Sequence, residues 1–297
     1  MNKAECSAPW MWPYGANSAF SVPSNPSAGW VARLLNQHDR ANLTPRFTCS
    51  DESLGALAYE RRVALGEVPT RDLSHDWYNG MAWLAFPKAK HWINTQHLGD
   101  ASVVSQMPFR SGNGRSRFRD ALTLFDESGA LLLTTRKDML FALMEHQWPC
   151  VFAKRDDSWH EQNRLLVFGH GLLDSMASAH PGLCAKVLPV LVSDLNVSES
   201  ELDQMIVNAL QQVGDPSNFS PLPVMGVPGW FDLSAQPGFY ENRQVFRAKP
   251  TAHRGLRAER LAFQVDGATL AVGKCARQSL PALQGEESPD SSEQSAG

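Results

Sequence analysis

The stretch PTRDLSHDWYNGMAWLAFPKAKHWIN, residues 69–94, is the part of the chain around which we expect the fold to be organised. Ionisable and amide side chains alternate in it with large aromatic ones, which is typical of a polar site set into an apolar wall. The spacing predicts a helix over residues 75–85, with Ser74 as its N-cap. Pro87 should end that helix, because proline donates no backbone hydrogen bond and crowds the preceding turn. A second helix is predicted over residues 88–97.

Outward from this stretch, apolar periodicity predicts further helices and a few strands. Residues 126–129, DESG, lie between two apolar runs and predict the turn of a β-hairpin. The other expected elements are a helix beginning near Ala28, helices over 51–65 and 136–148, a helix entered through Gly169 and Gly171, a buried strand over 185–192, and a helix capped by Ser198 and Glu201. Because these elements show no regular βα alternation, they predict an α+β fold that is mostly helical, with a small β-hairpin or sheet and long irregular connections.

The sequence predicts that the chain is organised in three parts. Residues 1–27, rich in Pro, Ser and Trp without a period, are expected to form an irregular N-terminal arm. Residues 28–282 are expected to form one globular domain, since the chain of 297 residues is 43% hydrophobic and can build a sizeable core. Residues 283–297 contain acidic but no basic side chains, which predicts a disordered acidic tail.

Composition narrows the class of protein. The formal net charge of −4 gives no reason to expect a polyanionic partner across the whole surface. The basic segment Arg243–Arg260 could meet phosphates, but it has few stacking aromatics, so a solvated face is favoured over nucleic-acid binding. No apolar run approaches the roughly 20 residues that span a bilayer, and no membrane partner or secretory signal is expected. The 5 widely spaced cysteines contain no CxxC pair, which favours free thiols in a reducing cytoplasm.

The first candidate catalytic residues lie in the focal stretch. His75 and Asn79 are four residues apart and share one face of the predicted helix, where they could bind a metal, orient water or hold a substrate. His75 could equally bond a neighbouring backbone carbonyl. Asp76 also has a simpler explanation, because an acidic residue in the first turn of a helix complements the helix dipole. Both interpretations stay open.

A second histidine, His170, lies in the apolar block VFGHGLLD, residues 167–174. Asp174 follows four residues later, a spacing at which a carboxylate can fix the tautomer of a histidine in a metal site or an acid–base pair. The alternative is a histidine whose hydrogen bonds are satisfied within the core, which is the commoner case in such surroundings.

Two further acidic residues, with Arg119, complete the candidate set. Asp120 is expected at the start of an apolar strand beside Arg119, where such a pair is usually structural. The functional alternative is that Asp120 or Asp126 supplies a hard oxygen ligand to a divalent metal. The candidate catalytic residues are therefore His75, Asp76, Asn79, Arg119, Asp120 and His170, and the candidate metal ligands are His75, Asp120, Asp126 and His170.

Four blocks taken together resemble a known family. They are LSHDWYNGMAWLAFPKAK, RDALTLFDESG, VFGHGLLD and PLPVMGVPGW, the last followed by FYENRQVFR. In this order, over roughly residues 55–250, they resemble the bacterial family DUF3025, a domain of unknown function. The resemblance implies one domain with a shared polar core, and it implies no activity, cofactor or catalytic residue.

Two hypotheses of different classes follow from the sequence. The favoured one is a metal-assisted, hydrolase-like enzyme in which His75, His170 and one or two acidic residues bind a divalent ion that activates water. Asn79 or Arg119 would orient the substrate. The alternative is a non-catalytic binding or scaffold protein whose buried histidine and aspartate groups are structural. In the enzyme the polar groups must meet in one solvent-reachable pocket, whereas in the scaffold each would be paired separately.

Overall fold

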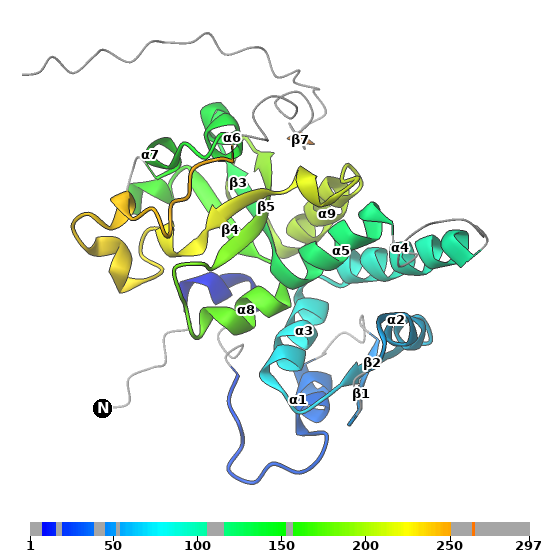
Figure 1. Ribbon diagram of the computed structural model, residues 1–297. Coiled ribbons are helices and arrows are strands. Elements are labelled where there is room, and N and C mark those ends of the chain that lie inside the picture. The colour runs from blue at the N-terminus through cyan, green and yellow to red at the C-terminus, as the bar shows by residue number, and fades with distance from the viewer. Residues whose placement is uncertain are drawn as a thin grey trace, which may run out of the picture.

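The computed structural model describes residues 8–15, 20–38, 45–51, 54–105, 116–152, 157–250 and 263–264. Within these ranges helices outnumber strands, and the strands form two sheets (Figure 1). The expected α+β class is therefore confirmed. The acidic tail over 283–297 and the greater part of the basic segment lie outside the described residues.

The secondary structure has the following bounds. The α-helices are α1 (Trp30–His38), α2 (Ala56–Ala64), α3 (Ser74–Ala85), α4 (Pro87–Ser105), α5 (Arg117–Ser128), α6 (Lys137–Met144), α7 (Trp148–Val151), α8 (His170–Met176) and α9 (Glu199–Leu210). The strands are β1 (Arg46–Cys49), β2 (Glu67–Thr70), β3 (Gly129–Thr134), β4 (Asn163–Val167), β5 (Cys184–Leu191), β6 (Ser220–Pro223) and β7 (Phe263–Gln264). Short 3-10 helices include η1 (Pro9–Tyr14) and η4 (Val224–Gly226).

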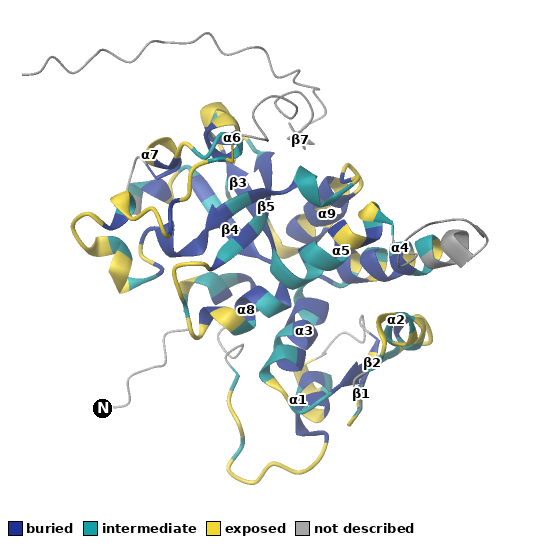
Figure 2. Ribbon diagram, viewed as in Figure 1, coloured by how far each residue is buried: buried dark blue, intermediate teal, exposed yellow. Residues whose placement is uncertain are grey.

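A mixed sheet forms the centre of the fold. Its strand order is β4-β3-β5-β6, with β7 pairing with β5, and β3 runs antiparallel to β4 but parallel to β5. Every residue of β3, GALLLT, is buried, as expected for a strand covered on both faces. Figure 2 shows the same dark blue along most of the neighbouring strands. This sheet is the most deeply buried part of the core.

A second, smaller unit of structure lies beside this sheet. β1 and β2 pair in parallel, and α1 and α2 pack against them. α3 packs against α1 on one side and α8 on the other, so it lies between the two sheets (Figure 1). The buried apolar side chains from both sides belong to one cluster. The focal stretch of the sequence therefore forms the connection between the two sheets.

Several local predictions are confirmed. Pro87 separates α3 from α4 and takes the first position of the second helix, where its missing donor is not needed. The Ser198 side chain accepts a hydrogen bond from the backbone N–H of Glu201, and the Glu201 carboxylate accepts one from the backbone N–H of Ser198, so the capping box is present. The buried strand expected over 185–192 is β5. In the N-terminal segment, Tyr14 Oη donates a 2.6 Å hydrogen bond to the backbone carbonyl of Val167, which holds η1 against β4.

The predicted hairpin at residues 126–129 is wrong. These residues end α5 and begin β3, and the antiparallel partner of β3 is β4, more than 25 residues further along the chain. Apolar residues 118, 121, 122 and 125 recur at helical spacing, and Ser116 caps the helix by accepting a bond from Arg119 N. Asp120 consequently lies in the first turn of a helix and not at the start of a strand.

The predicted cap of the focal helix is also wrong. Ser74 is the first residue of α3, Leu73 takes the N-cap position, and no side chain caps this end. Among the described residues, no helix is both long enough and apolar enough to cross a membrane.

Candidate functional site

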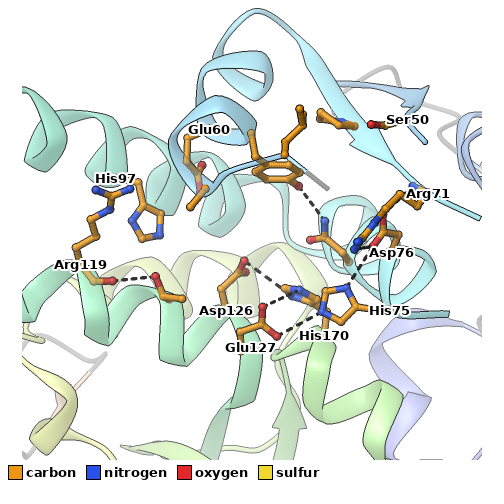
Figure 3. Close-up of a pocket in the computed structure, with 16 residues that line it drawn as sticks. Ser50, Glu60, Arg71, His75, Asp76, His97, Arg119, Asp126, Glu127 and His170 are labelled. Carbon is orange, nitrogen blue, oxygen red and sulfur yellow. Dashed lines mark hydrogen bonds and ion pairs between the residues drawn. The ribbon is translucent and has the colours of Figure 1, made fainter. Parts of the chain in front are cut away.

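A cavity of about 290 Å³ opens where the two parts of the fold meet. Its lining comes from the β1–α2–β2 segment and from α3, α4, α5 and α8 (Figure 3). Among the helices α5 contributes most, because Arg119, Thr123, Asp126 and Glu127 follow at intervals of four, three and one residues and so share one face of that helix.

Three side chains of the types that can bind a metal meet in this cavity. His75 on α3, Glu127 at the end of α5 and His170 at the start of α8 each offer a ligand atom, and these atoms lie within 4.8 Å of one another. Nε2 of His75 is 3.5 Å from one carboxylate oxygen of Glu127, and Nε2 of His170 is 3.6 Å from the other. The two imidazole rings meet edge to face, with centroids 4.6 Å apart. Two imidazole nitrogens and a carboxylate are thus gathered within 4.8 Å of one another.

Asp76 and Arg71 fix the position of His75. Asp76 Oδ1 lies 3.2 Å from Nδ1 of His75, the ring nitrogen that faces away from Glu127. Arg71 in turn binds both oxygens of Asp76, with its guanidinium at 2.7 and 3.0 Å and its backbone N–H at 2.7 Å. Burial opposes the charge on Asp76, but the bonds from His75 and Arg71 outweigh it and hold the pKa of this carboxyl below its usual range. Asp76 is therefore an anionic support for His75.

The two histidines have opposite electrostatic environments. Hydrogen bonds to Asp76 and then Glu127 raise the pKa of His75 to about 9, despite partial burial. Burial lowers the pKa of His170, although the carboxylates of Asp126 and Glu127 oppose this shift. His170 is 5% exposed, and its Nδ1 makes no hydrogen bond within the described part of the chain. At neutral pH, His170 is accordingly neutral, as a metal ligand must be.

A buried polar network supports the floor of the cavity. Lys90 on α4 donates to Asp126 at 2.6 Å and to Asn79 at 2.8 Å, and Asn79 donates to Tyr59 Oη at 2.9 Å. The other oxygen of Asp126 lies 3.9 Å from Nδ1 of His170. Burial opposes the charge of Asp126, but Lys90 and His170 prevail and lower the pKa of this carboxyl. Lys90 thus holds the Asp126 carboxylate near Nδ1 of His170, and Asp126 is not one of the three side chains that gather at the candidate metal position.

Glu60, on α2, is a further acidic group in the cavity. Its carboxylate accepts a 2.6 Å hydrogen bond from Asn94 Nδ2. Burial raises the pKa of Glu60 to about 7, a shift that the bond from Asn94 only partly reverses. A carboxyl with this pKa exchanges its proton near neutrality and is suited to general acid–base work.

The structure brings most of the predicted site residues together. His75, Asp76, Asn79, Arg119, Asp126 and His170 all line the cavity. Asp120 does not, because the helical path of α5 turns its exposed side chain away from Arg119's face. The expected pairing of His170 with Asp174 is replaced by contacts with Asp126 and Glu127.

Sequence reasoning missed Glu127 and Glu60 as members of the site. Glu127 lies within DESG, the segment whose composition predicts a hairpin turn. The signal that could have found it is the helical spacing of Arg119, Thr123, Asp126 and Glu127. Glu60 gives no comparable signal in the sequence.

The fold and the cavity define an α+β protein with a candidate metal centre of two histidines and one glutamate. The sequence profile of a family described as "Protein of unknown function (DUF3025)" matches residues 45–250, which include all three of these side chains. The chain belongs to this family, and the resemblance noted in its sequence blocks is confirmed. Neither the curated proteins nor the solved structures gave a significant match.

Proposed function

We propose that this protein is a metal-dependent hydrolase in which His75, Glu127 and His170 hold one divalent transition-metal ion. The observation that carries the proposal is the convergence of these three donors from three separate helices at the wall of one cavity. Two histidines and one carboxylate are a known ligand set of catalytic zinc, which leaves coordination positions for water and substrate.

The separations of the donor atoms support a shared ion. The two distances from histidine nitrogen to Glu127 oxygen, 3.5 and 3.6 Å, are longer than ordinary hydrogen bonds. Ligands bound at about 2.0–2.2 Å to a tetrahedral ion lie about 3.3–3.6 Å from one another. Each histidine faces a different oxygen of Glu127, and both separations are within the range expected for ligands that share one ion.

The surroundings support the same assignment. Asp76 contacts the rear nitrogen of His75, in the way that carboxylates orient histidine ligands in metal sites. Asp126 lies behind the rear nitrogen of His170 at 3.9 Å. A bound ion would supply a water molecule acidified to a pKa of about 7 and would polarise the bond to be cleaved. Glu60, which lines the same cavity with a pKa of about 7, is suited to pass a proton to or from that chemistry.

The scaffold hypothesis is less well supported by this arrangement. It expects each histidine and acidic group to be paired separately, whereas His75, His170, Glu127 and Glu60 share one cavity. We also propose a cytoplasmic location. Cys49, Cys150 and Cys184, the cysteines within the described residues, are free thiols, as expected in a reducing compartment.

Elemental analysis of protein purified without added metal tests the proposal. Wild-type protein is expected to carry close to one equivalent of metal, with zinc as the ion suited to hydrolysis, and Glu127→Gln and the double variant His75→Ala, His170→Ala should carry almost none. His180→Ala is the matched control, because His180 is exposed and does not line the cavity. Circular dichroism verifies that each variant is folded. Equal metal contents in wild type and the folded site variants would refute the metal centre, and iron in place of zinc would refute the hydrolytic assignment.

A further inference from the structure

Arg119 has an unusual environment for a positively charged side chain. It is only 9% exposed, it lines the cavity, and its Nε makes no hydrogen bond within the described residues. The ion pairs found among those residues include none from its guanidinium. In Figure 3 the side chain extends from α5 at the end of the cavity away from His75. Its backbone, by contrast, is fully engaged at the helix start, through Ser116 and Thr123.

Two other cations around the cavity, one buried and one half-buried, are each paired with a carboxylate. Arg71 is paired with Asp76, and Lys90 is paired with Asp126. The charge of Arg119 lowers the pKa of Glu60, but the Glu60 carboxylate accepts its hydrogen bond from Asn94, and the ion pairs found among the described residues do not join Glu60 to Arg119. A guanidinium cannot escape the cost of burial by losing its proton, because it stays charged at any physiological pH. Buried charges are therefore almost always paired, and the missing partner of Arg119 calls for an anion from outside the chain.

We propose that Arg119 is the receptor for an anionic group, a carboxylate or a phosphate, carried by the small molecule that is cleaved at the His75–Glu127–His170 centre. The guanidinium offers a planar fork of donors that matches either anion with two parallel hydrogen bonds. That the anion is part of a substrate rests on the proposed function. That Arg119 binds an anion rests only on the environment of Arg119 and does not depend on the proposed function.

The geometry of α5 limits the size of this substrate. Arg119 and Glu127 lie on one face of the helix, eight residues apart, which corresponds to about 12 Å along the helix axis. The cavity of about 290 Å³ is at the small end of the range for ligand sites. The substrate class is thus a small organic acid or phosphate ester whose anionic group lies on the order of 10 Å from the bond that is cleaved.

Thermal denaturation in the presence of simple anions tests the inference. Inorganic phosphate and malonate serve as the phosphate and carboxylate probes, with chloride at matched ionic strength as the reference. At tenfold excess over its dissociation constant, the anion that matches the site should raise the Tm of the wild type by about 2–4 °C. Arg119→Met should lose this rise, and Arg61→Met should keep it, because Arg61 is an exposed arginine on the neighbouring α2. Whichever probe acts identifies the anionic group.

The variant in the absence of any probe gives a second, independent readout. If Arg119 has no partner in the free protein, Arg119→Met removes an uncompensated charge, and its Tm should be equal to or above that of the wild type. A fall of several degrees would reveal a structural role and overturn the inference. So would a probe-induced rise that is the same in Arg119→Met as in the wild type, or no rise for either probe in the wild type.

Glu127→Gln separates this inference from the proposed function. That substitution removes a donor of the metal centre but leaves Arg119 in place. A probe-induced rise that persists in Glu127→Gln supports the anion receptor even if the wild type proves to contain no metal. Metal in the wild type together with equal responses of wild type and Arg119→Met refutes the receptor and leaves the hydrolase proposal standing.

Discussion

Lys90 and Asp126 form a buried ion pair, with Nζ 2.6 Å from Oδ1, that joins α4 to α5 beneath the candidate site. Lys90 is 4% exposed, so its charge is almost wholly removed from bulk water. The pair also determines where the second oxygen of Asp126 lies, 3.9 Å from Nδ1 of His170. The same contact therefore stabilises the fold and restrains one of the candidate ligands.

Lys90→Met should destabilise the protein by about 3 kcal/mol. Asp126 would be left without its counter-ion, and the value is at the low end of the usual range because the carboxylate keeps 22% of its side-chain exposure. Urea unfolding measures the loss. Lys88→Met, on the exposed side of the same helix, should change stability by less than about 0.5 kcal/mol. Adding Asp126→Asn to Lys90→Met should recover part of the loss, and strict additivity would contradict a direct pair.

Asp76→Asn should weaken metal binding about 10–100-fold without abolishing it. An amide in place of the carboxylate is a weaker acceptor for Nδ1 of His75, so it orients the ring less well, and it also holds Arg71 less firmly. Titration against a competing chelator measures the affinity. Asp120→Asn is the matched control, because this acidic residue is on the same helix as Glu127 but lies outside the cavity lining. A comparable loss in both variants would show that general surface charge, and not the support of His75, is responsible.

Metal binding should strengthen as the pH rises toward about 9. Hydrogen bonds to Asp76 and Glu127 raise the pKa of His75 to about 9, so a proton occupies the ligand nitrogen below that pH and must leave before a metal binds. The apparent affinity should therefore fall about tenfold for each unit of pH below 9. Measurements with the same chelator at pH 7.5 and 8.5 provide the check, and a pH-independent affinity would exclude His75 as a ligand.

In the metal-free protein, the same histidine should make the stability of the fold decrease as the pH rises. The folded-state pKa of His75, about 9, exceeds its usual value of 6.5, so the protonated ring stabilises the fold. This contribution is fully present below pH 6.5 and is lost as the pH rises through 9. In chelator-treated protein, His75→Ala should remove that loss of stability, as followed by urea unfolding at pH 6 and 9.

Glu60→Gln should make the stability of the protein less dependent on pH, in a lower pH range than the one that His75 affects. The folded-state pKa of Glu60, about 7, exceeds its usual value of 4.5, so the folded protein holds the extra proton and loses stability as the pH rises from 4.5 through 7. Glutamine keeps an oxygen for the bond from Asn94 but carries no charge. The variant should therefore gain stability relative to the wild type between pH 5 and pH 7.5. A difference that does not change with pH would refute this assignment.

Two glycines in the His170 block should respond differently to alanine. A side chain at Gly171 would meet the carboxylate of Glu127, which is free to move, so Gly171→Ala should displace this donor and lower metal content while the protein stays folded. A side chain at Gly169 would lie 2.5 Å from the backbone nitrogens of Ser128 and Gly129, which cannot move easily. Gly169→Ala should therefore lower the Tm by several degrees, by about 2–4 °C for each kcal/mol lost. Equal behaviour of the two variants would contradict the packing of α8 on α5.

The sequence allowed the focal stretch to be placed well, because strong local signals agree there. Pro87 marks a boundary through its own covalent geometry, and the capping box of Ser198 and Glu201 is a reciprocal local bond. The hairpin prediction was wrong because there the local signal disagrees with the packing of the fold. Residues 126–129 have turn-forming composition, yet the helix continues to Ser128 because its apolar face, including Phe125, is buried against the sheet.

The candidate site could be predicted only in part from the sequence. His75 and His170 were expected to face a shared carboxylate across one cavity, and the structure places their rings 4.6 Å apart. The identity of that carboxylate depended on the secondary structure of residues 117–128. A strand would place Asp120 and Asp126 on the same face, whereas the helix α5 directs Glu127 into the cavity. Glu60 enters from α2, and nothing in the local sequence encodes that long-range packing.

The junction between α5 and β3 has a mechanical consequence. The helix passes into the strand at Gly129 without a loop, and the carbonyl of Gly129 accepts bonds from the backbone nitrogens of Phe168 and Gly169 at 3.0 and 2.8 Å. Glu127 and His170 are thereby anchored at one point of the central sheet, while His75 belongs to the helix that joins this sheet to the smaller one. An ion held by all three would cross-link the two sheets. Its removal should increase amide hydrogen exchange in residues 45–85, while the strands of the large sheet stay protected.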